Sequence, residues 1–137
     1  MTIRKSTMED YLSIARSIQN KKLSYITPTL IKQDIQLGRQ YVMTNDRNKI
    51  IAICSLVYEP NYKYYAIKRL CIPNKKNCGK GYAQAMLEYM IKQPSAKVGC
   101  TPWSDNKAMI KMLTRLGFTL EYIFNEKWCF YSKEKIK

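Results

Sequence analysis

A basic, glycine-containing stretch has the residue types and spacing to bind an anion. It reads Lys76-x-x-Gly79-x-Gly81 and lies in a loop over residues 73–81. Glycine lets the backbone approach a ligand closely, and unpaired N–H groups gather at the positive start of a helix. The pattern predicts a phosphate cradle, or else a tight turn whose lysines are only solvated. It matches neither the P-loop nor the dinucleotide fingerprint, because neither full set of motif residues is present.

The elements on both sides of this loop would fix its position. Residues 64–72 are predicted to form a buried strand, because the run ends in apolar residues and Pro73 follows. The residues after Gly81 form a predicted helix that ends before Pro94, with apolar side chains at helical spacing. A strand, a glycine-containing loop and a helix start therefore come in the order that an anion site needs.

Three predicted strands joined by short turns lead into the loop. They cover residues 40–44, 49–58 and 64–72. The simplest topology for such strands is an antiparallel meander. A further strand is predicted over 97–101, and its connection through a helix predicts a parallel, right-handed crossover.

Two helices are predicted ahead of these strands, after a short first strand over 2–5. Ser6 and Glu9 have capping-box spacing and start the first helix, which reaches about Gln19. The residues predicted on its apolar face are Met8, Tyr11, Leu12, Ala15 and Ile18. After a basic linker over 20–25, Thr27 followed by Pro28 starts the second helix.

The C-terminal part contains one more predicted helix and a hairpin. Ser104 or Asp105 would cap the helix, which starts near Asn106, and Gly117 would end it. Two strands over 118–124 and 127–132 would then pair around a turn. The tail 133–137 is expected to be frayed.

The composition predicts one folded domain over 1–137. Hydrophobic residues make up 46% of the 137 residues, and no apolar run is long enough to span a membrane. The N-terminus lacks a signal-peptide pattern, so we expect a cytoplasmic protein. The net charge of +14 predicts attraction to anions such as RNA or phosphate-bearing cofactors. The alternative is that the charges are spread over the surface and serve no partner.

Histidine is absent, which excludes histidine bases and makes a metal site improbable. The five cysteines contain no Cys-x-x-Cys pair and are expected to be buried, reduced thiols. Any chemistry must therefore use carboxylates, tyrosine, cysteine, lysine, backbone amides or the substrate itself.

Two short motifs together resemble the Gcn5-related N-acetyltransferase family. The first is the loop motif, which the family usually writes Arg/Gln-x-x-Gly-x-Gly/Ala, and the second is Asn106 followed eleven residues later by Gly117-Phe118. The resemblance spans nearly the whole chain and implies an α/β fold with a mixed sheet. It implies antiparallel second to fourth strands, a central helix after a V-shaped splay, a parallel pair of fourth and fifth strands, and a C-terminal hairpin.

By this resemblance the cofactor is acetyl-CoA, with coenzyme A as a product. Lys76 stands where the family usually has Arg or Gln and would support the pyrophosphate. Main-chain amides would hold the pyrophosphate, and the resemblance assigns this to Cys78, Gly79, Lys80, Gly81, Tyr82 and Ala83. Leu70, Cys71 and Ile72 would pair with the pantetheine arm as an added strand does. Asn106 would approach the arm from the other side.

The catalytic residues differ from the family pattern. Met109 and Leu113 stand at the usual alanine and tyrosine positions, and leucine cannot protonate a departing thiolate. Glu59 is the candidate general base, or a solvated turn residue. Cys100, Tyr122 and Tyr131 are candidate proton donors, and Trp103 is a candidate for the acceptor site or a packing residue.

The resemblance implies transfer of an acetyl group to an amine of a protein or a small molecule. An alternative acceptor is an aminoacyl-tRNA, as in some toxin members of the family, and the charge of +14 favours it. A third possibility is a non-catalytic, basic nucleic-acid-binding protein on the same fold, which Leu113 permits. An exposed strand edge could also pair two subunits in a homodimer.

Overall fold

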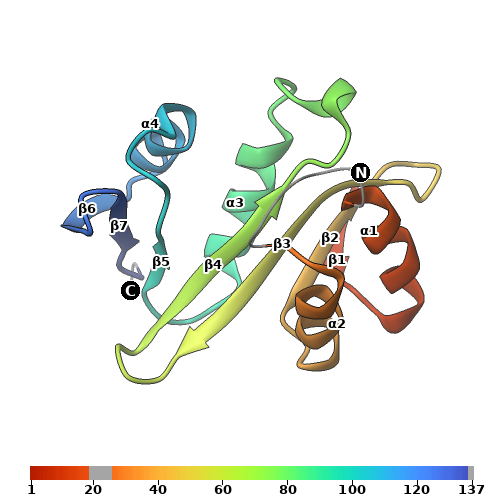
Figure 1. The fold of residues 1–137 in the computed structure, drawn as a ribbon, viewed down its shortest axis with the longest axis horizontal. Helices are drawn as coiled ribbons and strands as arrows, with labels where there is room; N and C mark the ends of the chain where they lie inside the picture. Colours follow the sequence, from red (N-terminus) through yellow and green to blue (C-terminus); the bar gives the residue numbers. More distant parts are fainter. Residues whose placement is uncertain (19–25, 136–137) are drawn as a thin grey trace.

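The computed structural model describes residues 1–18 and 26–135, which form a seven-stranded sheet with helices on both faces (Figure 1). The strands are β1 Thr2–Lys5, β2 Gln40–Thr44, β3 Ile50–Glu59, β4 Tyr64–Cys71, β5 Val98–Cys100, β6 Thr119–Phe124 and β7 Trp128–Lys133. The helices are α1 Tyr11–Ile18, α2 Pro28–Gln36, α3 Tyr82–Lys92 and α4 Lys107–Arg115, with single 3-10 turns at Met8–Asp10 and Lys75–Asn77. No helix of this described part is long and apolar enough to cross a membrane.

The predicted mixed sheet is confirmed. The strand order is β1-β2-β3-β4-β5-β7-β6, with β2, β3 and β4 antiparallel and β4 parallel to β5. All seven predicted strands agree with the observed ones to within one residue at both ends. The hairpin β6–β7 turns at Asn125 and Glu126, as predicted, and both residues have a positive φ.

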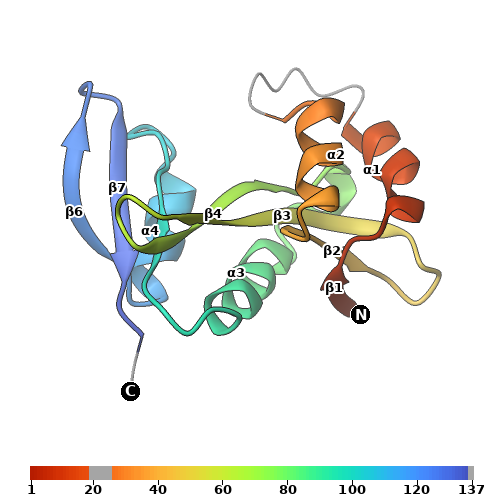
Figure 2. The ribbon, with the colours of Figure 1, turned by 90° about the horizontal axis from the view of Figure 1, so that it is seen from below.

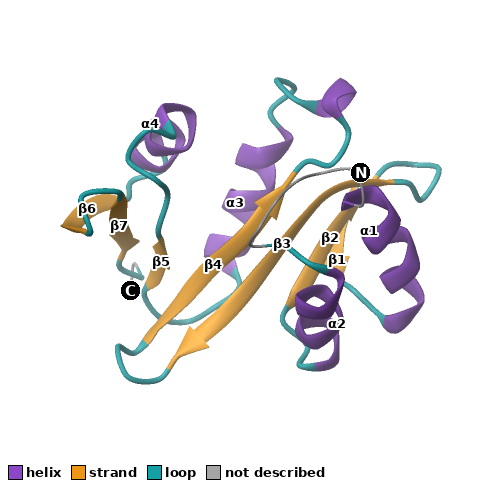
Figure 3. Ribbon diagram, in the orientation of Figure 1, coloured by secondary structure: helices purple, strands orange, loops and turns teal. Residues whose placement is uncertain are grey.

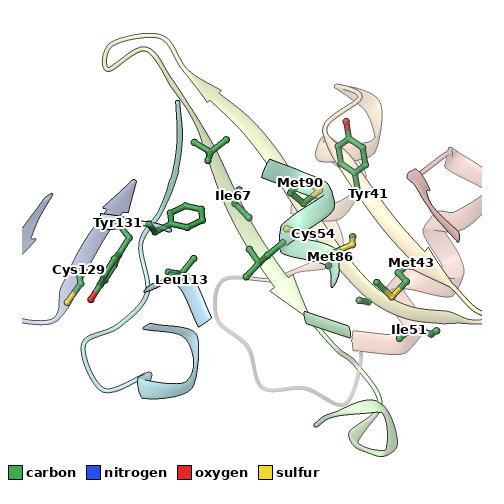
Figure 4. Close-up of a cluster of buried hydrophobic side chains, with 14 residues drawn as sticks. Tyr41, Met43, Ile51, Cys54, Ile67, Met86, Met90, Leu113, Cys129 and Tyr131 are labelled. Carbon is green, nitrogen blue, oxygen red and sulfur yellow. The ribbon is translucent and has the colours of Figure 1, made fainter. Parts of the chain in front are cut away.

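The helices cover the two faces of the sheet unequally. Helices α1 and α2 lie on one face, over β2 and β3, and α3 lies on the other (Figure 2). The smaller core cluster packs α1 and α2 against Val42 and Ile53. The larger cluster packs α3 and α4 together, with Met86, Leu87 and Leu113 all fully buried (Figure 4). Within residues 1–18 and 26–135, the face that carries α1 and α2 has no helix over β5, β6 and β7 (Figure 2).

The N-terminal helix differs from its prediction in two ways. Its cap is Thr7 rather than Ser6, because the Asp10 carboxylate accepts a hydrogen bond from the Thr7 N–H at 2.7 Å. The buried residues are Ile14 and Ile18, while Met8 and Leu12 of the predicted apolar face are 47% and 62% exposed. The predicted apolar face of the helix therefore differs from the face that packs on the core, because several apolar residues of this segment are exposed. The predicted linker over 20–25 lies outside the described residues.

The second helix confirms its predicted start. The Thr27 hydroxyl accepts a hydrogen bond from the Leu30 N–H at 3.2 Å, and Pro28 occupies the first turn. Gly38 follows the helix with a φ of +69°, a conformation that favours glycine. The sequence did not predict that Asp34 of this helix is fully buried.

The sheet opens between β4 and β5. The two strands pair only at Tyr65 with Val98 and at Ala66 with Gly99, and beyond this point they diverge toward the loop that precedes α3 (Figure 3). A bulge accompanies the opening, because the register between β3 and β4 shifts by one residue and Arg69 takes a φ of +55°. Bulges bend a strand and increase its twist, so this one helps to turn β4 away from β5.

A buried ion-pair network ties the bulge to α2. The Asp34 carboxylate accepts hydrogen bonds from Arg69 at 2.6 and 2.9 Å, from Arg39 at 2.7 Å and from the Ser55 hydroxyl at 2.6 Å. Asp34 is 0% exposed, so its charge needs these partners. A left-handed backbone is unfavourable for arginine, and the bond to Asp34 compensates for part of that cost.

We predict that Asp34→Asn lowers the free energy of unfolding by about 3–5 kcal/mol, because it leaves two guanidinium groups without their counter-charge. Urea unfolding measures this change. The matched control is Asp46→Asn, since the Asp46 side chain is 98% exposed and its pairing distance to the N-terminus is 3.8 Å. The control should change stability by less than about 0.5 kcal/mol. A loss below about 1 kcal/mol in Asp34→Asn would show that the network does not stabilise the fold.

Candidate functional site

The loop before α3 presents unpaired backbone N–H groups. Gly79 and Gly81 take φ values of +77° and +83°, which other residues adopt only with strain. Within the described residues, no protein acceptor is recorded for the N–H groups of residues 79–83, and the first bond of α3 runs from Ala85 to Gly81 at 3.1 Å. The N–H of Cys78 differs from the prediction, because it donates to the Lys75 carbonyl at 3.1 Å.

The space beside these N–H groups is open. A Cβ added at Gly79 or at Gly81 would meet no atom within 4 Å, so the glycines are needed for backbone conformation rather than for packing. The side chains of Lys76 and Lys80 are exposed beside the loop. A helix start with free donors, open space and flanking cations fits a phosphate group.

The end of β4 offers a second recognition feature. Beyond Ala66 the strand keeps β3 on one side and has no paired residue of β5 on the other. Leu70 and Ile72 pack against the larger core cluster, and Cys71 packs against the smaller one. Alternate side chains therefore anchor the strand to both faces while its edge borders the gap. An extended ligand with amide groups can pair with such an edge as a strand would.

Asn106 is the cap residue of α4, and α4 lies on the other side of the opening from the loop that precedes α3 (Figure 1). Its side-chain oxygen accepts a hydrogen bond from the Met109 N–H at 3.3 Å, so the cap of this helix is Asn106 and the prediction of Ser104 or Asp105 as the cap was wrong. The oxygen is therefore used as a helix cap. A contact of Asn106 with a cofactor stays a prediction. Because the oxygen caps the helix, such a contact would use the side-chain amide nitrogen.

The two candidates for the acceptor side are Glu59 and Trp103. Glu59 pairs with Tyr64 at the end of the β3–β4 hairpin and forms an ion pair with Lys68 at 3.2 Å. The hairpin end is about 13 Å along β4 from Lys68, since a strand rises about 3.3 Å per residue. Trp103 is 45% exposed and packs edge to face with Trp128, their ring centroids 4.8 Å apart.

The candidate proton donors are poorly suited to the task. Leu113 is fully buried in the core, so its position serves packing. Cys100 lies at the opening, and burial raises the pKa of its thiol to about 12, which makes it a weak acid. Tyr131 lies on β7 and Tyr122 on β6, one and two strands beyond β5 in the sheet order. Among the residues first considered, none is a strong acid beside the gap.

The cysteines differ in exposure, and Cys71 and Cys100 are partly buried. Cys54 and Cys129 are buried, as predicted, and burial raises the pKa of Cys54. Cys78 is exposed, which contradicts the prediction of a buried thiol for this position. The reason is local, because Cys78 belongs to the open loop rather than to a strand.

An aromatic cluster on the open sheet face was missed by the sequence analysis. Tyr64 and Tyr122 each lie with their ring centroids 5.1 Å from that of Phe130. A Cβ at Gly99 would approach Tyr64 and Phe130 to 2.7 Å, so only glycine fits beneath these rings. These three aromatic residues and Gly99 come from four different strands and share no local sequence pattern. The only sign of the cluster in the sequence was a single glycine in a short strand.

The other residues missed were those of the buried network. Asp34, Arg39, Ser55 and Arg69 lie at unrelated spacings, and the chain brings them together only through the sheet. A buried acid within a helix has the same sequence pattern as an exposed one.

No protein-family model and no curated protein matches this chain. Solved structures do match it over nearly the full length. An acetyltransferase of the GNAT family from Bacillus cereus aligns with a TM-score of 0.80 and 20% identity, covering 99% of this chain and 98% of that one. Ard1 from Thermoplasma volcanium aligns with a TM-score of 0.79 and 16% identity, covering 99% and 98%.

A third similar structure is a spermidine N-acetyltransferase SpeG chimera from Vibrio cholerae and hSSAT. It aligns with a TM-score of 0.78 and 14% identity and covers 98% of this chain and 96% of that one. At such identities the similarity establishes the fold alone. The chain has the fold of the Gcn5-related N-acetyltransferases, and the resemblance drawn from its two motifs is confirmed at that level.

Proposed function

We propose that this protein is an acetyl-CoA-dependent N-acetyltransferase that transfers an acetyl group directly to an amine. The observation that carries the proposal is the juxtaposition of unpaired N–H groups over residues 79–83 with the open edge of β4. A pyrophosphate and an amide-bearing arm are the two chemical features that this pair of sites complements. The fold shared with known acetyltransferases supports the same conclusion.

Each part of the site would have one task. The loop amides and the lysines Lys76 and Lys80 would hold the pyrophosphate, and Leu70, Cys71 and Ile72 would align the pantetheine arm. Acetyl-CoA supplies an activated acetyl group as a thioester. A backbone N–H near Cys71 or Ile72 would polarise the thioester carbonyl, and such a donor contributes about 2.7–4 kcal/mol to transition-state stabilisation. Correct positioning of the two reactants can contribute roughly 7–11 kcal/mol.

The acceptor amine would approach from the sheet face that carries α1 and α2. Side chains alternate along β3, so Ser55, which contacts α2, and Glu59 lie on this same face. The exposed ring of Trp103 and the Glu59 carboxylate are the groups proposed for the acceptor. The acceptor itself is an amine of a protein or of a small molecule.

The cofactor site is tested by a thermal-shift titration with acetyl-CoA. At about 100 times Kd the ligand should add roughly 2.7 kcal/mol of stability, which corresponds to a shift of about 5–10 °C. Gly79→Glu should abolish the shift, because it places a negative side chain over the donors. Gly38→Glu is the matched control, since Gly38 also has a positive φ and open space but lies after α2. The control should unfold at a lower temperature yet keep the shift.

The exposed thiol of Cys78 provides an independent measurement at the same loop. Maleimide should label Cys78 rapidly and leave the buried Cys54 and Cys129 unlabelled until the protein unfolds. Acetyl-CoA should slow the labelling of Cys78, as read by peptide mass spectrometry. If acetyl-CoA causes neither a thermal shift nor protection in the folded protein, the loop is only a basic turn.

The general-base role of Glu59 is tested by Glu59→Gln. We predict a fall of about tenfold or more in kcat/KM for the amine near neutral pH, shrinking as the pH approaches the amine's own pKa. The KM for acetyl-CoA should not change, because Glu59 lies away from the loop. Glu9→Gln, in the turn before α1, is the control. A rate equal to wild type across the pH range would remove Glu59 from the mechanism.

A basic stripe on α4 favours aminoacyl-tRNA as a second candidate acceptor. Lys107, Lys111 and Arg115 are spaced four residues apart and are all exposed, so they follow one side of the helix. We predict that tRNA binding weakens steeply with salt, and that Lys111→Gln lowers the slope of log K against log salt by about 1. Lys32→Gln on α2 is the control. A shallow slope, unchanged by Lys111→Gln, would leave a protein or small-molecule amine as the acceptor.

A further inference from the structure

A pocket of about 630 Å³ lies where the C-terminal end of α3 crosses the sheet. Its floor is made by side chains of β2, β3 and β4 on the α3 face, namely Tyr41, Leu56, Tyr58 and Tyr65. Helix α3 separates the pocket from the glycine loop by its full length, roughly 16 Å for 11 residues. The proposed acceptor side is the opposite face of the sheet. The pocket has the size of a small-molecule site, and the proposed acetyl transfer does not use it.

Three tyrosines give this pocket flat rings and hydroxyl groups. The rings of Tyr58 and Tyr65 are neighbours, with centroids 4.9 Å apart and planes inclined at 51°. Tyr41 is only 6% exposed, and its hydroxyl has no hydrogen-bond partner within the described residues. Figure 4 shows this hydroxyl pointing away from Met86 and Met90. It is therefore available to a ligand in the pocket.

Positive charge borders the same pocket, and none of the described residues that line it is acidic. Lys5 at the end of β1 is exposed and forms no ion pair within residues 1–18 and 26–135. Arg39 donates to Asp34 at 2.7 Å, but that single carboxylate also pairs with Arg69. The two arginines and the one acid therefore keep a net positive charge.

The charges favour an anionic ligand over a cationic one. The last carbonyls of a helix attract cations, and this end of α3 borders the pocket. Gln93 already uses two of them, because its side-chain amide donates to the Tyr89 carbonyl at 3.0 Å and its N–H to that of Met90 at 3.3 Å. Lys5 and Arg39 would repel a cation. A flat anion can instead stack on the rings and pair with these two side chains.

We propose that this pocket binds a nucleotide, with its base against the tyrosine rings and its phosphate beside Lys5 and Arg39. The Leu56 N–H donates to the Arg39 carbonyl at 2.9 Å, which places Arg39 one strand over and two residues along from Tyr58. These backbone positions are about 8 Å apart by the spacing and rise of strands, so one nucleotide can contact both. A free nucleotide and an unpaired nucleotide of RNA share this chemistry. The inference does not rest on the proposed acetyl transfer.

Isothermal titration with AMP and with a short single-stranded oligo(A) RNA tests the site. Tyr58→Ala should weaken binding about tenfold or more, because it removes a ring on which the base stacks. Tyr58→Phe keeps the ring and should keep the affinity. Tyr62→Ala is the matched control, since Tyr62 lies in the same hairpin and is 74% exposed but does not line the pocket. Of the probes that Tyr58→Ala weakens, the tighter one identifies the source of the nucleotide.

Two further variants separate the pocket from the glycine loop and test its charge. Gly79→Glu should leave AMP binding unchanged, because the loop lies at the other end of α3. Lys5→Gln should weaken AMP binding and reduce its salt dependence, whereas Lys49→Gln, exposed in the β2–β3 turn, should do neither.

The proposal is overturned if neither AMP nor the RNA binds the folded protein at millimolar concentration. It is also overturned if Gly79→Glu abolishes AMP binding that Tyr58→Ala leaves intact, because the nucleotide then occupies the loop. Binding of tetramethylammonium without binding of AMP would contradict it as well, since the tyrosines would then form a cage for a cation.

Discussion

The buried carboxylate of Asp34 is the constraint on which the geometry of the site depends. It joins α2 to the bulge at Arg69, where the backbone takes a left-handed conformation that arginine would not otherwise favour. The bulge lies where β4 leaves β5, so the same interaction that stabilises the fold also supports the open strand edge. A hydrophobic residue at position 34 could pack there, but it could not hold a guanidinium at a fixed place in the strand.

The open edge and the phosphate-type loop are consecutive in the chain, and this links their positions. β4 ends at Cys71, the loop follows, and α3 begins at Tyr82 with its core side chains fully buried. The helix is therefore fixed by packing while its first turn stays free of protein acceptors. An extended ligand that pairs with β4 would meet the N–H groups of the loop at one end, so a single molecule could use both features.

The sequence predicted those parts of the structure that depend on local rules. Thr27 with Pro28, the Gly79 and Gly81 loop and the Asn125 turn each act through their own backbone, and their elements were located correctly. Features that depend on distant partners were missed, such as the burial of Asp34 and the contact of Tyr64 and Tyr122 with Phe130. The face of α1 was misjudged because Met8 and Leu12 are apolar yet exposed, and periodicity alone does not show which apolar residues reach the core.

None of the described residues considered as proton donors is a strong acid beside the gap, and this is compatible with acetyl transfer when the two proton transfers are compared. A thiol has an ordinary pKa of about 8.5, so a thiolate can leave near neutral pH with little assistance. An alkyl amine such as that of lysine has a pKa of about 10.4, and removing its proton at pH 7 costs more than 4 kcal/mol. The amine is thus the more demanding partner. A chain of +14 disfavours a second positive charge near its surface, and this lowers the pKa of a bound amine. If the proposed activity holds, the excess of lysine and arginine would assist the reaction and would also attract the proposed anionic cofactor.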